Sequence, residues 1–218
     1  MNTKTSYIII ALITLASFAI GFYFYPVFPA EVASHWGLNG EVNGYMSKFW
    51  GLFLMPIIMI VLSLLLFWLP KIDPLKENVA AFRKYYDGVI VGIILFLFYI
   101  HLLTILWNTG YHFDMGKMIV PPVALMWYLL GVALPNIKQN WFMGIRTPWT
   151  LANIRVWDET HIWSGKIFRC SALVALVGFL LPSYLMFWFL IVPIVFSAIG
   201  SVVYSYFLFG KYGADKRE

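Results

Sequence analysis

Apolar residues in this chain gather into six long runs that are bounded by charged residues, Pro or Gly. A helix needs about 20 apolar residues to cross a bilayer. The pattern therefore predicts about six transmembrane helices in a single membrane domain, 1–218. We place the helices at about 7–27, 49–69, 88–108, 118–134, 167–181 and 184–209, and the last two form a hairpin through Pro182-Ser183.

Lys and Arg residues give this bundle an orientation, because they are retained on the cytoplasmic side of short loops. With the N-terminus inside, all 15 lie inside except Lys48 and Lys117. Both ends of the chain carry basic residues, which favours an even number of crossings. The fold class is thus an all-α polytopic membrane helix bundle with both termini in the cytoplasm.

Composition supports a membrane protein. Hydrophobic residues make up 61% of the chain and charged residues 11%, against about 25% charged in an average soluble protein. The net charge of +5 needs no nucleic acid to explain it, because the basic residues fall where anionic lipid headgroups lie. We expect membrane lipids as partners and no direct binding of nucleic acid.

Two polar segments remain, and the predicted topology puts them on opposite sides of the membrane. The outer loop, 28–48, contains Asn39-Gly40 and Asn43-Gly44, which are strong turn signals. We therefore expect an ordered extracellular loop. The cytoplasmic loop, 135–166, contains Pro148, which forces Thr147 out of helical geometry.

A short cytoplasmic amphipathic helix follows in the same loop. Asn153 is suited to cap it, and its residues suggest that it ends near Ser164. Arg155 and Glu159 can pair on one face. We expect this helix to lie on the membrane surface, where indole rings anchor at headgroup depth. The anchoring residues would be Trp141, Trp149, Trp157 and Trp163.

The cytoplasmic loop also carries a specific motif. The stretch from Asn140 to Leu151, NWFMGIRTPWTL, with Val156-Trp157 and Thr160-His161 after it, resembles the signature of the SdpI family of bacterial toxin-immunity and signal-transducing membrane proteins. The outer loop is similar to the N-terminal pattern of that family at His35-Trp36, Gly40, Asn43-Gly44 and Ser47-Lys48. Asn43 stands where the pattern has Asp. The resemblance extends from about Pro26 to Lys166.

What this resemblance implies is a protein of the bacterial plasma membrane that confers resistance to a membrane-active antimicrobial peptide toxin, with capture of a cytoplasmic repressor as a second role. Candidate toxin-binding residues are His35, Trp36, Asn39, Gly40, Asn43, Gly44 and Lys48. Candidate residues of the cytoplasmic signature are Asn140, Gly144, Arg146, Thr147, Pro148, Trp149, Trp157, Thr160, His161 and Gly165.

Single polar residues leave alternatives open. Arg146 can bind a carboxylate or phosphate, or it can join its loop to Asp73 or Asp87. His35 can organise the outer loop through a hydrogen bond, or it can hold a metal together with His112 and Asp114. The intramembrane His101 marks a pathway or a buried interhelical bond.

An enzyme is not expected, because the chain contains no recognised catalytic motif, and no cofactor is expected. The alternative function is a small-solute transporter or a channel component. Pro56, Pro121-Pro122, Pro193 and Gly200 would then break helices around a solute site. His101 and Asn108 are the polar residues that such a site would use.

Overall fold

Six long helices form the bundle in this computed structural model, which describes residues 2–37 and 40–213. They are α1 (Thr3–Phe24), α2 (Lys48–Ile72), α4 (Arg83–Asn108), α5 (Met115–Ala133), α7 (Ile154–Gly178) and α8 (Ser183–Tyr212). The short elements are β1 (Glu31–Trp36), β2 (Val42–Ser47), α3 (Lys76–Ala81), η1 (Leu134–Asn136) and α6 (Pro148–Ala152). The predicted all-α polytopic bundle is confirmed.

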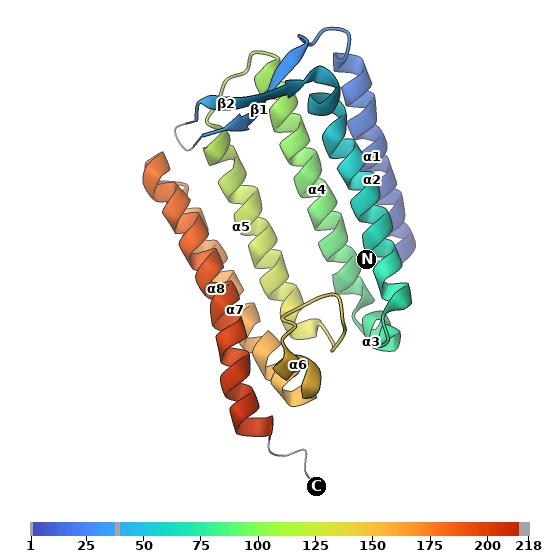
Figure 1. Cartoon of the computed structure of the whole chain (residues 1–218), viewed down its shortest axis with the longest axis vertical. Helices are drawn as coiled ribbons and strands as arrows, with labels where there is room; N and C mark the ends of the chain where they lie inside the picture. Colours follow the sequence, from blue (N-terminus) through green and yellow to red (C-terminus); the bar gives the residue numbers. More distant parts are fainter. Residues whose placement is uncertain (1, 38–39, 214–218) are drawn as a thin grey trace.

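The two polar segments lie at opposite ends of the bundle (Figure 1). The β1–β2 hairpin covers one end. The other end holds α3, α6, the loop before α6 and the C-terminal end of α8. By the distribution of Lys and Arg, this second end faces the cytoplasm. We therefore call the hairpin end the outer end and the α3–α6 end the cytoplasmic end.

Helix boundaries follow local capping chemistry. Asn2 caps α1 by accepting a hydrogen bond from the Lys4 amide, and Asp114 caps α5 by accepting one from the Lys117 amide. The turn between α7 and α8 falls at residues 179–182, so the predicted hairpin at Pro182-Ser183 is confirmed.

Five helices among the described residues are long and apolar enough to cross a membrane, namely α1, α2, α4, α8 and the α5–η1 segment. The sixth long helix, α7, carries Arg155, Asp158, Glu159 and Lys166 in its first half. Its apolar second half packs against α5 and α8. α7 is not among the membrane-span candidates of the described residues, so the sixth crossing stays a prediction.

The prediction of a separate amphipathic helix on the membrane surface, ending near Ser164, was wrong. Asn153 does cap a helix, accepting from the amides of Arg155 and Val156, but that helix continues unbroken to Gly178. Trp157 is fully buried instead of anchored in headgroups. Trp157 and His161 face other parts of the protein, because the loop after α5 folds over them, whereas Ile154 and Ile162 are exposed.

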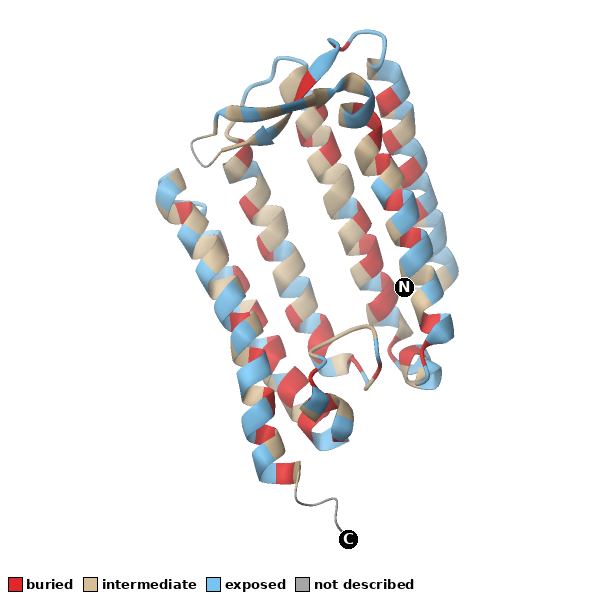
Figure 2. Cartoon of the chain, viewed as in Figure 1, coloured by how far each residue is buried: buried red, intermediate tan, exposed pale blue. Residues whose placement is uncertain are grey.

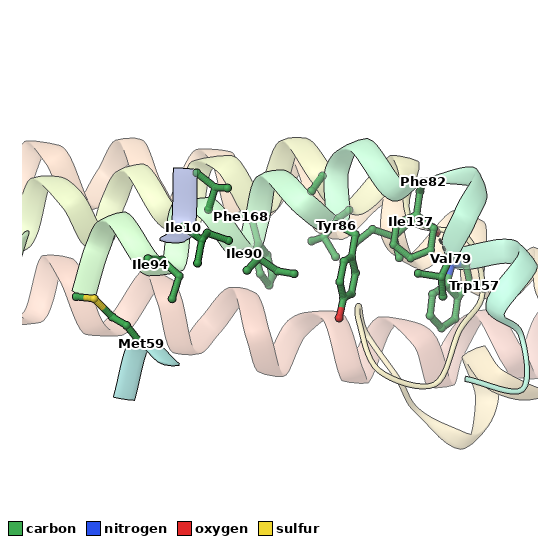
Figure 3. Packing of buried hydrophobic residues seen from close by; sticks show 13 residues of the cluster. Ile10, Met59, Val79, Phe82, Tyr86, Ile90, Ile94, Ile137, Trp157 and Phe168 are labelled. Carbon is green, nitrogen blue, oxygen red and sulfur yellow. Dashed lines mark hydrogen bonds between the residues drawn. The ribbon is translucent and has the colours of Figure 1, made fainter. Parts of the chain in front are cut away.

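Buried apolar side chains of α1, α2, α3, α4, α5 and α7 form the main core cluster, and Figure 2 marks the buried positions along these helices. Trp157 lies beside Val79 and Ile137 in the main core cluster (Figure 3). Further along the bundle, the rings of Trp127 and Phe168 stack at 4.3 Å. Many large apolar side chains elsewhere are exposed, for example Leu12, Leu64 and Phe196, as expected for helices that face lipid.

Candidate functional sites

The outer site begins with the β1–β2 hairpin, which is antiparallel and irregular. Its register shifts on both sides of His35. Gly40 has φ +80°, which glycine adopts without strain, and the Gly40 amide donates to the Gly37 carbonyl at 3.0 Å. The predicted ordered loop is confirmed, although its strands were not anticipated. Asn39 lies outside the described residues.

Two contacts fix the hairpin to the helices below it. A Cβ on Gly51 of α2 would lie 2.2 Å from Val32 Cγ2, so only glycine lets β1 approach α2 this closely. Asn108 of α4 meets Ala33 with its side-chain amide: Oδ1 accepts from the Ala33 amide at 2.8 Å, and Nδ2 donates to the Ala33 carbonyl at 3.0 Å. The amide thus takes the place of a neighbouring strand along β1.

His35 and Asn43 connect the two strands. Nδ1 of His35 is hydrogen-bonded to Oδ1 of Asn43, which confirms the prediction that His35 organises this loop. Gly44 lies opposite His35, and a Cβ on Gly44 would be 2.9 Å from the Cβ of His35. The amide of Asn43 therefore has a structural use that needs no negative charge.

Beneath the hairpin lies a cavity of about 350 Å³ with mostly apolar walls. β1 supplies part of its lining, and α2, α4, α5 and α8 supply the rest. Its lining includes Trp36, Thr104, Met115, Met186, Phe187 and Leu190. The indole Nε1 of Trp36 is buried and has no hydrogen-bond partner among the described residues. A buried donor without a partner costs free energy, so this N–H would gain from a hydrogen-bond partner.

The outer candidates divide by position. His35 and Trp36 line the cavity. Asn43 and Gly44 do not line it, but both contact His35. Lys48 lies at the other end of the hairpin, with its Nζ 4.7 Å from the centre of the Tyr25 ring. The structure does not bring Lys48 to the cavity.

The metal alternative gains no support from the described residues, in which no group of three His, Cys, Asp or Glu side chains could hold an ion. His112 packs on Trp107, with ring centres 4.5 Å apart. Asp114 caps α5 and accepts from Ser183 Oγ at 3.1 Å. His35 is held by Asn43.

The cytoplasmic motif is built around a turn at Asn140, which is 1% exposed. Its Oδ1 accepts from the amides of Phe142 and Met143, and its Nδ2 donates to the carbonyls of Lys138 and Met143. All these distances are 2.7–2.9 Å. One side chain thus satisfies four backbone groups of the turn.

Gly144, Trp157 and His161 form the centre of this motif. Gly144 has φ +113°, and a Cβ there would lie 2.4 Å from His161 Nε2. His161 Nε2 accepts from the Ile145 amide at 3.0 Å, and Nδ1 is 2.8 Å from the Trp157 carbonyl. An acceptor at Nε2 and a donor at Nδ1 define a neutral imidazole. Burial lowers the pKa of His161 to about 4.

Hydroxyl and indole groups complete the packing of the motif. Thr147 and Thr150 form a reciprocal cap at the start of α6, and Thr147 Oγ1 lies 3.0 Å from Ser205 Oγ on α8. The indole Nε1 of Trp157 donates to the Ile137 carbonyl at 2.8 Å. Trp149 packs edge-on against Tyr206 at 5.2 Å. Thr160 is buried, and its Oγ1 has no partner among the described residues.

Gly165 serves the crossing of α5 and α7. A Cβ on Gly165 would lie 2.7 Å from the Gly131 carbonyl oxygen and 2.8 Å from the Pro135 ring. Close crossings through small residues are typical of helices packed in membranes. The role of this candidate is therefore to let two helices meet.

Arg146 contacts neither of the two expected carboxylates. Its Nη1 donates to the Trp141 carbonyl within the same loop. Asp73 instead accepts from the Trp141 amide at 3.0 Å and from the Leu75 amide at 2.7 Å, while Asp87 is paired with Arg83. The two loops are thus joined through Asp73 and the backbone of the motif, and the Arg146 side chain is exposed.

Exposure differs among the cytoplasmic candidates. Arg146 and Pro148 are exposed, together with the neighbouring Trp141 at 50%. The candidates Asn140, Thr147, Trp157, Thr160, His161 and Gly165 are buried. The remaining candidates, Gly144 and Trp149, are partly exposed. A protein partner that binds this face can therefore touch the exposed residues most directly, and the buried ones only through them.

The features that favoured a transporter have structural explanations. α2, α5 and α8 continue without a break through Pro56, Pro121-Pro122 and Pro193. Asn108 is used by the hairpin. His101 is fully buried, and its Nε2 lies 3.3 Å from the Ser17 carbonyl oxygen, which is the interhelical contact that we expected as one of two possibilities.

Several residues of both sites were missed in the sequence. Met115, Met186 and Phe187 line the outer cavity, but in the sequence they look like any other lipid-facing residue. Gln139 is central to the cytoplasmic site, where its Nε2 donates to the carbonyls of Thr150 and Leu151 at 2.8 and 2.9 Å. Its position next to Asn140 was the available signal.

Together these features define a class: a multi-pass membrane protein with a hairpin-covered cavity outside and a tightly hydrogen-bonded motif inside. The SdpI/YfhL protein family matches residues 136–205, which contain that motif. A domain of unknown function, DUF1648, matches residues 12–60, which contain the hairpin. The predicted resemblance to the SdpI family is confirmed.

The similarity also extends over the full length of a curated protein. The chain is 24% identical over 210 residues to the immunity protein SdpI of Bacillus subtilis (strain 168), covering 96% of this chain and 98% of that protein. No solved structure matches the chain with significance.

Proposed function

We propose that this protein is an SdpI-like immunity protein that protects a bacterial cell against a membrane-active antimicrobial peptide toxin, without enzymatic chemistry. The observation that carries the proposal is the cavity beneath the outer hairpin, which is lined in part by Trp36, a residue whose buried Nε1 has no partner among the described residues. The similarity to an immunity protein over 96% of the chain supports the same function.

The cavity suits part of a peptide rather than a small polar solute. Its lining is mostly apolar and includes three Met, two Ile, one Phe and one Leu. Burying an apolar side chain in such a site contributes roughly 1.5–3 kcal/mol. Trp36 Nε1 can donate to a peptide carbonyl. His35, whose side chain is exposed at the rim, can contact the part of the peptide that stays outside.

We propose a second partner, a cytoplasmic repressor, for the exposed surface formed by Trp141, Arg146 and Pro148. This surface combines an indole that is 50% exposed with a guanidinium that has one donor group engaged within its own loop. Aromatic and Arg side chains are those that most often dominate binding energy at interfaces. The buried motif residues would hold this surface in shape.

Survival under toxin challenge tests the first proposal. Cells without an SdpI-type protein would express this chain or an empty vector and receive a panel of membrane-active antimicrobial peptides, including any encoded beside its gene. We expect survival only with the chain, and we expect Trp36→Ala to abolish it while Trp188→Ala, on the exposed face of α8, does not. Equal killing with and without the chain across the panel would contradict the proposal.

Capture of a partner tests the second. The full-length protein in membranes would be presented with the DNA-binding regulator encoded beside its gene, and binding would be measured with Arg146→Gln and, as the control, Lys166→Gln. We expect loss of binding only for Arg146→Gln. If both variants retain the regulator equally, the Arg146 surface is not its docking site.

A further inference from the structure

The cytoplasmic end contains a basic pocket that neither proposed role uses. It has a volume of about 310 Å³ and lies among four helices. α1 contributes Thr3 and Tyr7, α2 contributes Pro70 and Lys71, α3 contributes Lys76, Val79 and Ala80, and α4 contributes Arg83. Three of these side chains are cationic.

The carboxylate of Asp87, beside the pocket, is already occupied by hydrogen bonds within the protein. Asp87 is fully buried, and its two oxygens accept from Arg83 Nε at 2.7 Å and from Thr3 Oγ1 at 2.6 Å. Arg83 Nη2 donates to the Tyr7 hydroxyl oxygen at 3.3 Å. That hydroxyl is therefore an acceptor for Arg83, and its own hydrogen can be donated to a ligand.

Positive charge in the pocket exceeds the negative charge that faces it. The ion pairs of the described residues involve Arg83 with Asp87 and Arg155 with Glu159, and none includes Lys71 or Lys76. Glu77 follows Lys76 but does not line the pocket. A site lined by ammonium, guanidinium and phenol donors fits an anion such as a phosphate group.

An apolar groove meets this pocket at Tyr7. The groove has a volume of about 380 Å³ and runs between α1 and α2. Its lining includes Ala11, Leu15, Ile60, Leu64 and Phe67. Tyr7 lines both the groove and the basic pocket, and its ring packs on Phe67 at 4.1 Å. An anionic head at the cytoplasmic end and an apolar tail in the membrane segment are the two parts of a phospholipid.

We propose that the pocket and groove together bind one anionic phospholipid of the cytoplasmic leaflet. The phosphate lies among Lys71, Lys76, Arg83 and the Tyr7 hydroxyl, and an acyl chain lies along the groove between α1 and α2. Basic pockets between membrane helices on the cytoplasmic side are suited to such headgroups. This inference is independent of toxin immunity.

Native mass spectrometry of the full-length protein in detergent tests the site. The probes are phosphatidylglycerol, phosphatidylcholine and, separately, inorganic phosphate. We expect the protein to retain phosphatidylglycerol in preference to phosphatidylcholine. Each lysine near an anionic headgroup contributes about fivefold in affinity, so Lys71→Gln/Lys76→Gln should weaken retention roughly 10- to 30-fold.

Two further variants separate head from tail. Lys138→Gln/Lys166→Gln removes the same charge from exposed positions at the same end, and it should leave retention unchanged. Ala11→Phe fills the groove without touching the basic residues and should also reduce lipid retention, whereas Val203→Phe, on exposed α8, should not.

Three outcomes would overturn the proposal. The first is equal loss from the two lysine pairs, which would mean a diffuse charge effect. The second is equal retention of phosphatidylcholine. The third is displacement of the lipid by inorganic phosphate together with normal retention in Ala11→Phe, which would assign the pocket to a soluble phosphate.

Discussion

The outer cavity and the cytoplasmic motif use their polar groups in opposite ways. In the motif, Asn140 satisfies four backbone groups and both nitrogens of His161 lie within hydrogen-bond distance of backbone partners. In the outer cavity, Trp36 is one of the lining residues, and its buried Nε1 lacks any partner among the described residues. The motif is therefore a fixed structural core, and the cavity is suited to receive a ligand. The most distinctive stretch of sequence mainly maintains shape.

The largest expected effect comes from Gly144→Ala. The new Cβ would lie 2.4 Å from His161 Nε2 at φ +113°, and strain in this region costs about 1–3 kcal/mol before the clash is counted. We expect a loss of about 2–4 kcal/mol in the free energy of unfolding, measured by thermal or denaturant unfolding in detergent. Gly210→Ala is the control, since its Cβ meets nothing within 4 Å. Similar stability of both variants would show that the motif is not rigid.

Acid should weaken the motif through His161. Its pKa is about 4 in the folded protein against the ordinary value of 6.5, so between these pH values the unfolded chain binds more protons. Stability is then fully present above pH 6.5 and is lost as the pH falls towards 4, by up to about 3 kcal/mol. Unfolding would be followed across this range in the wild type and in His161→Gln. The free energy of unfolding of the variant should depend less steeply on pH. The same pH dependence in both proteins would show that His161 does not cause it.

A smaller effect is expected where the hairpin meets α4. Asn108→Leu removes the donor and the acceptor that hold Ala33, and each unsatisfied, partly buried group costs about 1 kcal/mol or more. We expect a loss of about 1–2 kcal/mol and faster hydrogen exchange of the Ala33 amide. Thr109→Ala, one residue further along, is the control. Unchanged exchange at Ala33 would mean that the hairpin is held by its apolar contacts alone.

The smallest effect on stability should come from Trp36→Phe. This variant distinguishes a ligand-binding role in the outer cavity from a structural role most clearly. The change removes a buried N–H without a partner, so stability should stay equal or rise by up to about 1 kcal/mol. Protection against a toxin that the wild type resists should fall nonetheless. Trp188→Phe, on the exposed face of α8, should change neither. Full protection in Trp36→Phe would show that the indole N–H does not contact the ligand.

Much of this protein could be predicted from its sequence, because lipid imposes a simple rule on helix length. Runs of about 20 apolar residues, the Lys and Arg distribution and the cap at Asn153 depend on local chemistry that a chain carries at each position. These features determined six long helices, the two ends of the bundle and the start of α7.

Only the tertiary structure decided which polar groups face one another. An apolar stripe that includes Trp157 and His161 predicts burial equally well in lipid or in protein, so the sequence could not show that the loop after α5 covers it. The cavity combines Trp36 with Met115 and Phe187 from distant helices, and the phospholipid site combines Tyr7 with Lys71 and Lys76. Such groupings depend on how helices pack, and helical periodicity alone does not specify the partner of each face.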